Sequence, residues 1–256
     1  MFNCPIVKRS HYAEPPGKTM KTYKAANWQS ISAILILSSA FSVNAESSDI
    51  SCLYETSVQP AVKKFGLQSY NAANETKKWY LWRTDKSVEA SNAAGSFSEK
   101  WTITDQKAVF YQAIYHDKKF LLDFQPSDLK ILGRRTDMET RRQLFPKHLL
   151  AQLKQTGKGF FKTYKILKYQ GEIAGAEYKV NWLPELNLAA RIEKTTSARV
   201  VITKLEALYP LDSSPYRQQS LEKYDDMDYA DIGDNESHPV VAQLQKSIGI
   251  GYAHQH

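Results

Sequence analysis

The chain has 256 residues, of which 12% are aromatic, and a formal net charge of +7 at pH 7. This length suits one domain with a sizeable core, or one domain with an appendage. The basic balance does not indicate nucleic-acid binding, because the sequence has no RRM, zinc-finger or helix-turn-helix pattern.

Residues 20–45 have the layout of a secretory signal peptide. Lys21 and Lys24 form a charged n-region, residues 31–43 are mainly apolar, and Ala45 ends a small-x-small cleavage pattern. A membrane-spanning helix needs about 20 apolar residues, whereas this stretch is shorter and contains four serines. A cleaved leader is therefore favoured over an anchor, and we expect no transmembrane segment in the mature protein.

Cleavage near Ala45 predicts a periplasmic protein that begins at Glu46. A signal peptide normally begins near its charged region, so Met20 is an alternative translation start to Met1. Removal of the leader, residues 1–45, leaves Cys52 as the only thiol. No intrachain disulfide can then form, and a buried, unreactive thiol is favoured over an intermolecular disulfide.

The net charge is unevenly distributed along the chain. Five cations and one acid lie in the leader, whereas residues 222–236 contain seven acids and one lysine. The part between them, 46–221, therefore carries a net charge of about +8. Such a basic body is compatible with solvated faces, or with attraction to an anionic partner such as a lipid surface. We predict a β-rich binding domain over 46–221 and an acidic strap with a short C-terminal helix over 222–256.

The body is dominated by the signals of short strands. Runs rich in aromatic and β-branched residues are separated by turn residues, which predicts an antiparallel meander before residue 125 and another after residue 160. The predicted strands are 77–83, 87–90, 99–104, 108–116, 119–124, 163–169, 176–182, 188–194 and 199–208.

Both faces of the predicted strands carry apolar and aromatic side chains. In 108–116, Tyr111 and Tyr115 share one face, while Phe110 and Ile114 lie on the other. A sheet with one wet face would show polar residues on that side. The second face must be covered by the chain itself, which is the commoner case, or by a bound ligand. The ligand hypothesis makes the candidate binding residues Trp79, Trp82, Trp101, Tyr111 and Tyr115.

A helix is predicted between the two groups of strands. Pro146 suits its first turn and Gly157 suits the position after its last turn. Its apolar stripe is formed by Leu149, Leu150 and Leu153. A second short helix is predicted over 57–65. The resulting fold class is α+β, mainly antiparallel β, with a single curved, half-barrel-like sheet and a covering helix; a two-sheet β-sandwich is the alternative.

The acidic tail is the candidate metal site. An EF-hand loop that starts at Asp226 does not match, because its sixth position is aspartate instead of glycine. An irregular site could combine Asp231 and Asp234 with His254 and His256. Imidazole would favour zinc or copper, and carboxylates alone would favour calcium. The alternative is an acidic strap on the body, held by the apolar parts of Tyr224, Tyr229 and Ile232.

The sequence contains none of the common catalytic motifs. A G-x-S-x-G elbow, a P-loop, an H-E-x-x-H pair and a G-x-G-x-x-G turn are all missing. We predict no cofactor other than a divalent metal in the tail. A non-catalytic binding protein is therefore favoured over a metal-binding accessory protein, and a hydrolase without a recognisable motif is the third hypothesis.

Three segments resemble a family of uncharacterised periplasmic proteins of Gram-negative bacteria. They are WLPEL at 182–186, LEALYP at 205–210 and YADIGD at 229–234. This resemblance covers most of the mature chain and implies no known activity. The layout of the body is also similar to the half-barrel of periplasmic lipoprotein carriers, in which helices cover the concave side of a curved sheet. This second similarity concerns the architecture only and transfers no functional residue. An exported protein that binds an apolar, lipid-like ligand or a protein partner is predicted from the two apolar faces of the strands and from the basic body.

Export can be tested at the N-terminus of the secreted product. Because the cleavage pattern ends at Ala45, we expect N-terminal sequencing of protein from the periplasm to begin near Glu46. An uncleaved chain held in the membrane would contradict the signal-peptide interpretation and support an anchor.

Overall fold

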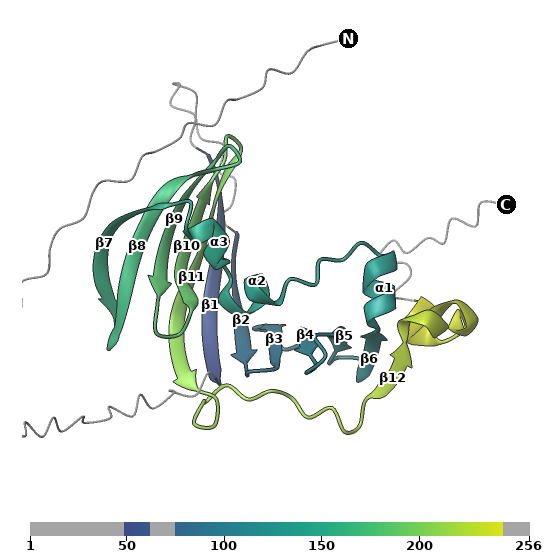
Figure 1. The fold of residues 1–256 in the computed structure, drawn as a ribbon. Helices are drawn as coiled ribbons and strands as arrows, with labels where there is room; N and C mark the ends of the chain where they lie inside the picture. Colours follow the sequence, from purple (N-terminus) through teal and green to yellow (C-terminus); the bar gives the residue numbers. More distant parts are fainter. Residues whose placement is uncertain (1–48, 62–74, 243–256) are drawn as a thin grey trace, which may run out of the picture. The chain divides into compact units, whose positions relative to one another are not determined.

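The computed structural model describes residues 49–61 and 75–242, whose strands form one open sheet of twelve (Figure 1). The strand order is β12-β6-β5-β4-β3-β2-β1-β11-β10-β9-β8-β7. The strands are β1 Ile50–Pro60, β2 Glu75–Arg83, β3 Ser87–Asn92, β4 Phe97–Ile103, β5 Val109–Tyr115, β6 Phe120–Phe124, β7 Lys154–Phe161, β8 Tyr164–Ile173, β9 Ala176–Leu183, β10 Leu188–Thr195, β11 Arg199–Pro210 and β12 Asp225–Asp228. The helices are α1 Pro126–Ile131, α2 Met138–Gln143, α3 Lys147–Leu150 and the 3-10 helix η1 Tyr229–Asn235.

The prediction of a single, mainly antiparallel sheet is confirmed, and the two-sheet alternative is wrong. Every neighbouring pair of strands is antiparallel except β12 and β6, which are parallel. The two predicted meanders are joined edge to edge by β1, which pairs with β2 on one side and with β11 on the other. Long-range pairing through β1 therefore makes one sheet of two local ones.

The predicted helix over 57–65 is wrong in its first part. Residues 57–60 continue β1, where Val58 is paired with Val201 of β11 and with Glu75 of β2. Pro60 is the last residue of the strand, a position at which a proline interrupts no further ladder bonds. Residues 62–65 of that prediction lie outside the described residues.

The helix that follows Pro146 is shorter than predicted. α3 ends at Leu150, and Gly157 lies within β7 instead of following a helix. The pairing of β7 with β8 shifts register between Gln155 and Gly157, which is the kind of irregularity that a glycine in a strand accommodates. Pairing with a neighbouring strand therefore overrides the local helix signal.

Residues 125–153 pack on one face of the sheet, here called the inner face. Leu129 of α1 and Met138 of α2 join the core of β4, β5 and β6. Leu150 and Leu153 form another core with Trp182 and other residues of β9 and β10. The segment around Leu149–Leu153 thus covers the sheet as expected.

The opposite face is covered by residues 211–224, which run across it without regular structure. The ring of Tyr216 lies 4.8 Å from that of Tyr80, and its carbonyl accepts a hydrogen bond of 3.0 Å from Trp82 Nε1. Further along, Gln218 donates to Glu89 at 2.6 Å. The chain itself therefore covers the second apolar face.

The acidic tail extends the sheet and closes one core. β12 pairs with β6, and the ring of Tyr229 stacks on that of Phe124 with centroids 4.7 Å apart. Ile232 of η1 and Val241 are buried in the same core. The tail is thus bound to the body by main-chain pairing and apolar contacts.

Several predictions concern segments outside the described residues. The leader, 1–45, and both C-terminal histidines, His254 and His256, belong to these segments. In the described ranges, none of the helices is long and apolar enough to cross a membrane.

A charge at Leu150 tests the packing of the helical segment. Leu150 is 7% exposed, so Leu150→Asp places a carboxylate among apolar side chains, and we expect a loss of at least about 3 kcal/mol of unfolding free energy. The matched control is Ile131→Asp at an exposed position of α1, which should change stability by less than about 0.5 kcal/mol. Urea unfolding of both variants measures the difference, and equal effects would contradict this packing.

Candidate functional site

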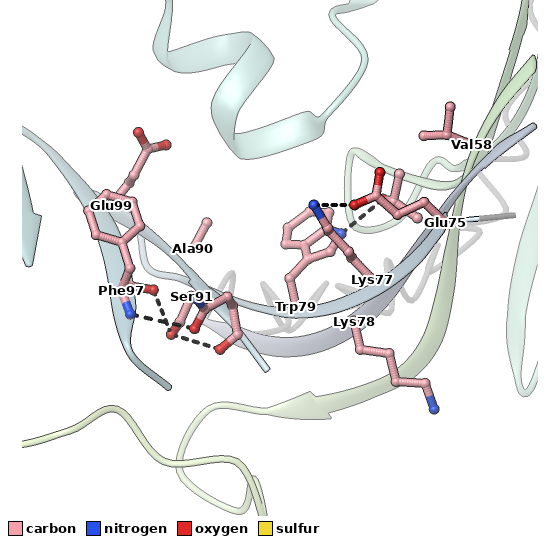
Figure 2. Close-up of a pocket in the computed structure, with 11 residues that line it drawn as sticks. Val58, Glu75, Lys77, Lys78, Trp79, Ala90, Ser91, Phe97 and Glu99 are labelled. Atoms are coloured by element: carbon pink, nitrogen blue, oxygen red, sulfur yellow. Dashed lines mark hydrogen bonds and ion pairs between the residues drawn. The ribbon is translucent and has the colours of Figure 1, made fainter. Parts of the chain in front are cut away.

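A cavity of about 360 Å³ opens on the inner face (Figure 2). It is lined by the last part of β1, the first part of β2, the last part of β3 and the first part of β4. The helical segment covers the neighbouring strands but leaves the side chains here half-exposed. The apolar lining comes from Val58 of β1, Trp79 of β2, Ala90 of β3 and Phe97 of β4. We call this cavity the inner groove.

Trp79 is the largest side chain in the inner groove, and contacts with residues of β1 fix its position. Its ring stacks on that of Tyr54, with centroids 4.8 Å apart and planes 16° apart. Its Nε1 donates to Thr56 Oγ1 at 3.1 Å. Tyr54 is itself fully buried and donates its hydroxyl to the carbonyl of Ala189 at 2.8 Å. The indole is therefore preorganised, which lowers the entropic cost of binding a ligand against it.

The hollow arises at Ala90, whose side chain is a single methyl group. Ala90 is paired with Leu81 of β2 and with Glu99 of β4. On this face its diagonal neighbours are Trp79 and Phe97, two strand positions away from those partners. A small residue between two large rings leaves the space that the cavity occupies.

The rim of the inner groove is polar and carries charges of both signs. Lys77 and Glu75 form an ion pair of 2.6 Å at the surface. Glu99 accepts a hydrogen bond of 3.0 Å from Tyr111 Oη. Figure 2 shows Trp79 and Glu99 on one side of the sheet and Lys78 directed to the other. An apolar interior with a polar mouth suits an amphipathic ligand.

Two of the aromatic residues predicted to bind ligand are covered by cations of the chain. Trp101 and Tyr111 share the inner face but are only 2% exposed each. The guanidinium of Arg141 lies 3.3 Å from the ring centre of Trp101, and that of Arg134 lies 5.0 Å from that of Tyr111. Cation–π contact therefore occupies the ring faces that a ligand would use.

The other predicted aromatic residues divide between the two faces. Tyr115 is half-buried on the inner face, with its ring 5.2 Å from that of Phe97 in the groove. Trp82 lies on the opposite face and bonds to Tyr216. Strand alternation separates Trp82 from Trp79 already in the sequence. The groove residues Val58, Ala90 and Phe97 were missed, because their part in the site depends on which strands are neighbours.

The predicted metal ligands are only partly described. Asp231 and Asp234 are exposed residues of η1. Within residues 49–61 and 75–242, there is no group of three His, Cys, Asp or Glu side chains that could hold a metal ion. His254 and His256 lie outside these ranges, so the metal site in the tail stays a prediction.

A buried histidine on the opposite face makes contacts that resemble those of a catalytic pair. His116 Nε2 lies 2.7 Å from Ser98 Oγ, and its Nδ1 lies 3.0 Å from Tyr224 Oη. Burial lowers the pKa of His116, which favours the neutral ring. Ser98, however, is fully buried, so its hydroxyl cannot contact a substrate in this conformation. These bonds serve to fix residues 211–224 to the sheet.

Comparison with known proteins shows distant similarity of fold. No family model matches the chain, and no curated protein matches its sequence. PNGF-II is 13% identical with a TM-score of 0.35; the match covers 72% of this chain, which spans only 32% of PNGF-II. A chain of the Pseudomonas aeruginosa MucA/MucB complex is 8% identical with a TM-score of 0.33. That match covers 70% of this chain and 57% of the other. A putative outer membrane lipoprotein-sorting protein domain from Vibrio parahaemolyticus is 8% identical with a TM-score of 0.22. That match covers 68% of this chain and 89% of the domain. The resemblance to a periplasmic family stays a prediction.

Cys52 lies in the core behind the inner groove. It is fully buried, and burial raises its pKa to about 12, although the neighbouring Arg83 opposes the shift. At pH 8 such a thiol is ionised in only about one molecule in ten thousand. A nucleophilic role for this cysteine is therefore disfavoured.

The reactivity of this thiol can be measured with a chromogenic disulfide reagent. We expect Cys52 to react in the folded protein only as fast as the protein unfolds, because the thiolate is both scarce and shielded. A Cys52→Ala/Ser127→Cys variant, with its thiol at an exposed position of α1, should react at the rate of a free cysteine. Equal rates for the two folded proteins would refute the buried state.

Proposed function

We propose that the protein is a non-catalytic periplasmic binding protein that holds an apolar, lipid-like ligand in the inner groove. The observation that carries this proposal is Trp79, a preorganised indole that lines an apolar cavity of about 360 Å³. Ligand cavities of proteins have volumes of about 300–1,000 Å³ and are mainly apolar with a few polar groups. The inner groove fits this description in size and in the chemistry of its walls.

The ligand class follows from the distribution of polar groups. The walls offer Trp79, Ala90 and Phe97, which contact hydrocarbon favourably. The mouth offers Lys77 and Glu99, which suit the polar end of an amphipathic molecule. A ligand with charges along its whole length would lose hydration on the apolar walls without compensation. A single acyl chain with a polar head is therefore the preferred class.

Binding can be tested with a fluorescent fatty acid as the probe. Trp79→Ala removes the largest contact surface and should weaken binding by roughly tenfold to a hundredfold. Ala90→Leu fills the hollow and should weaken binding to a similar degree without removing the contact of Trp79 with Tyr54. Fluorescence titration gives the two dissociation constants.

The matched control is an exposed aromatic residue outside the groove. Phe160 of β7 is 73% exposed, and Phe160→Ala should leave the dissociation constant of the probe unchanged. Thermal unfolding of each variant establishes that the fold is intact. Unaltered binding by both folded groove variants would sink the proposal, as would a loss caused by Phe160→Ala alone.

A protein partner is the second candidate, and the edge of the sheet favours it. β7 is the last strand in the sheet order, so one side of it presents main-chain groups to which a partner strand could add. Phe160 lies on this strand as an exposed apolar side chain. Under this hypothesis, Phe160→Ala weakens the binding of the partner, while Ala90→Leu leaves it intact.

A further inference from the structure

A second cavity, of about 520 Å³, lies beneath the loop that joins α1 to α2 and does not share lining residues with the inner groove. Its walls come from the turn before β5, from α1 and from residues 133–136. The lining contains no acid and four cations, which are Lys107, Lys130, Arg134 and Arg135. We call it the basic cavity.

The acids that lie closest in the sequence are engaged elsewhere. They are not among the lining residues of the basic cavity, and each has a partner elsewhere. Asp105 forms an ion pair of 3.0 Å with Lys86. Asp128 accepts a hydrogen bond of 2.8 Å from the backbone amide of Gln125. Asp137 accepts one of 3.2 Å from the backbone amide of Thr140. The residues that line the cavity therefore carry formal charge of one sign only, which is complementary to an anion.

The fold holds the guanidinium of one cation and the backbone of another in place. The guanidinium of Arg134 lies over the rings of Tyr111 and Phe124, at 5.0 and 5.5 Å from their centres. Its amide donates to the carbonyl of Leu129 at 2.9 Å, which ties the loop back to α1. Lys107 has φ 64, in the left-handed region, and its amide closes a turn on Thr104 at 2.9 Å. A fixed guanidinium such as that of Arg134 binds an anion at a lower entropic cost than a free side chain.

Two exposed apolar side chains lie between Lys130 and Arg134 in the sequence. Ile131 is 81% exposed and Leu132 is 40% exposed, although Leu129 in the preceding turn is fully buried. Adjacent exposed aliphatic residues are unfavourable in water. Apolar residues next to lysine and arginine are typical of segments that lie in the interface of an anionic membrane. A protein interface needs about 800 Å² from each partner, which two side chains do not supply.

We propose that the basic cavity binds the phosphate-bearing headgroup of an anionic membrane lipid while Ile131 and Leu132 enter the acyl boundary of the bilayer. The four cations neutralise the phosphate, and the two aliphatic side chains leave water. Attachment at this surface goes beyond the binding of a ligand in the inner groove, and either could exist without the other.

Vesicle binding of the mature protein tests the proposal. We expect cosedimentation with phosphatidylcholine vesicles that contain phosphatidylglycerol, and little with phosphatidylcholine alone, since each cation near an anionic surface strengthens binding about fivefold. A double variant, Lys130→Gln/Arg135→Gln, should lower the partition coefficient by roughly 25-fold. Ile131→Ser should lower it by about tenfold without a change in charge.

The control carries the same change in net charge at another place. Lys158→Gln/Lys165→Gln alters exposed lysines of β7 and β8 and should keep the partition coefficient within about twofold. If the partition coefficient falls as much in this control as in Lys130→Gln/Arg135→Gln, only the net charge of the protein matters, and the proposal is wrong. Thermal unfolding should be unchanged in all three variants, because every altered side chain is exposed.

A second arm separates a lipid headgroup from free phosphate. Calorimetric titration with inorganic phosphate alone should give weak binding, and Ile131→Ser should not affect it. If phosphate binds tightly and Ile131→Ser still binds vesicles like the unaltered protein, the cavity is a site for a free anion and the proposal is wrong. Failure to bind either kind of vesicle also overturns it, and would point to an acidic protein as the partner.

Discussion

The arrangement of the sheet and its covering segment depends on the buried guanidinium of Arg83. This side chain is 4% exposed, and its two terminal nitrogens donate to the carbonyls of Arg142 and Leu186, each at 2.8 Å. Burial lowers the pKa of Arg83, so these bonds must replace the water that the charge has lost. Arg142 belongs to α2, and Leu186 lies between β9 and β10. Arg83 of β2 therefore ties the helical segment and the β9–β10 turn to the first meander, in addition to the strand pairing through β1.

The groove lies where neither the helical segment nor a large side chain covers the inner face of the sheet. On the inner face, Arg141 closes over Trp101. On the opposite face, the contacts of Ser98, His116 and Tyr224 hold an irregular segment against the strands. Ser98 and His116 are buried and Tyr224 is half-buried, and their hydrogen bonds to one another offset the cost of removing polar groups from water. The helical segment leaves the region around Ala90 on the inner face half-exposed, and the proposed ligand would bind there without displacing any part of the chain.

Many of the individual strands could be predicted from the alternation of side chains along them. The order in which the strands pair could not. The strand from Val109 to Tyr115 and its two apolar faces follow from residue order alone. β1 was missed because its sequence is mixed and ends in Pro60; its central position is set by pairing with distant strands. The same alternation places Trp79 and Trp82 on different faces. The hollow at Ala90 could not be found from aromatic residues, since it depends on a small side chain whose neighbours come from other strands.

The sequence predicted an acidic strap on the basic body, held by the apolar parts of Tyr224, Tyr229 and Ile232. Among the described residues, the ion pairs join residues of the body to one another. The tail is held instead by pairing of β12 with β6 and by stacking of Tyr229 on Phe124. Asp228 accepts a hydrogen bond from the amide group of Gln125. The tail thus docks mainly through main-chain and apolar contacts, and the six ion pairs of the described residues do not include the lysines and arginines that line the basic cavity.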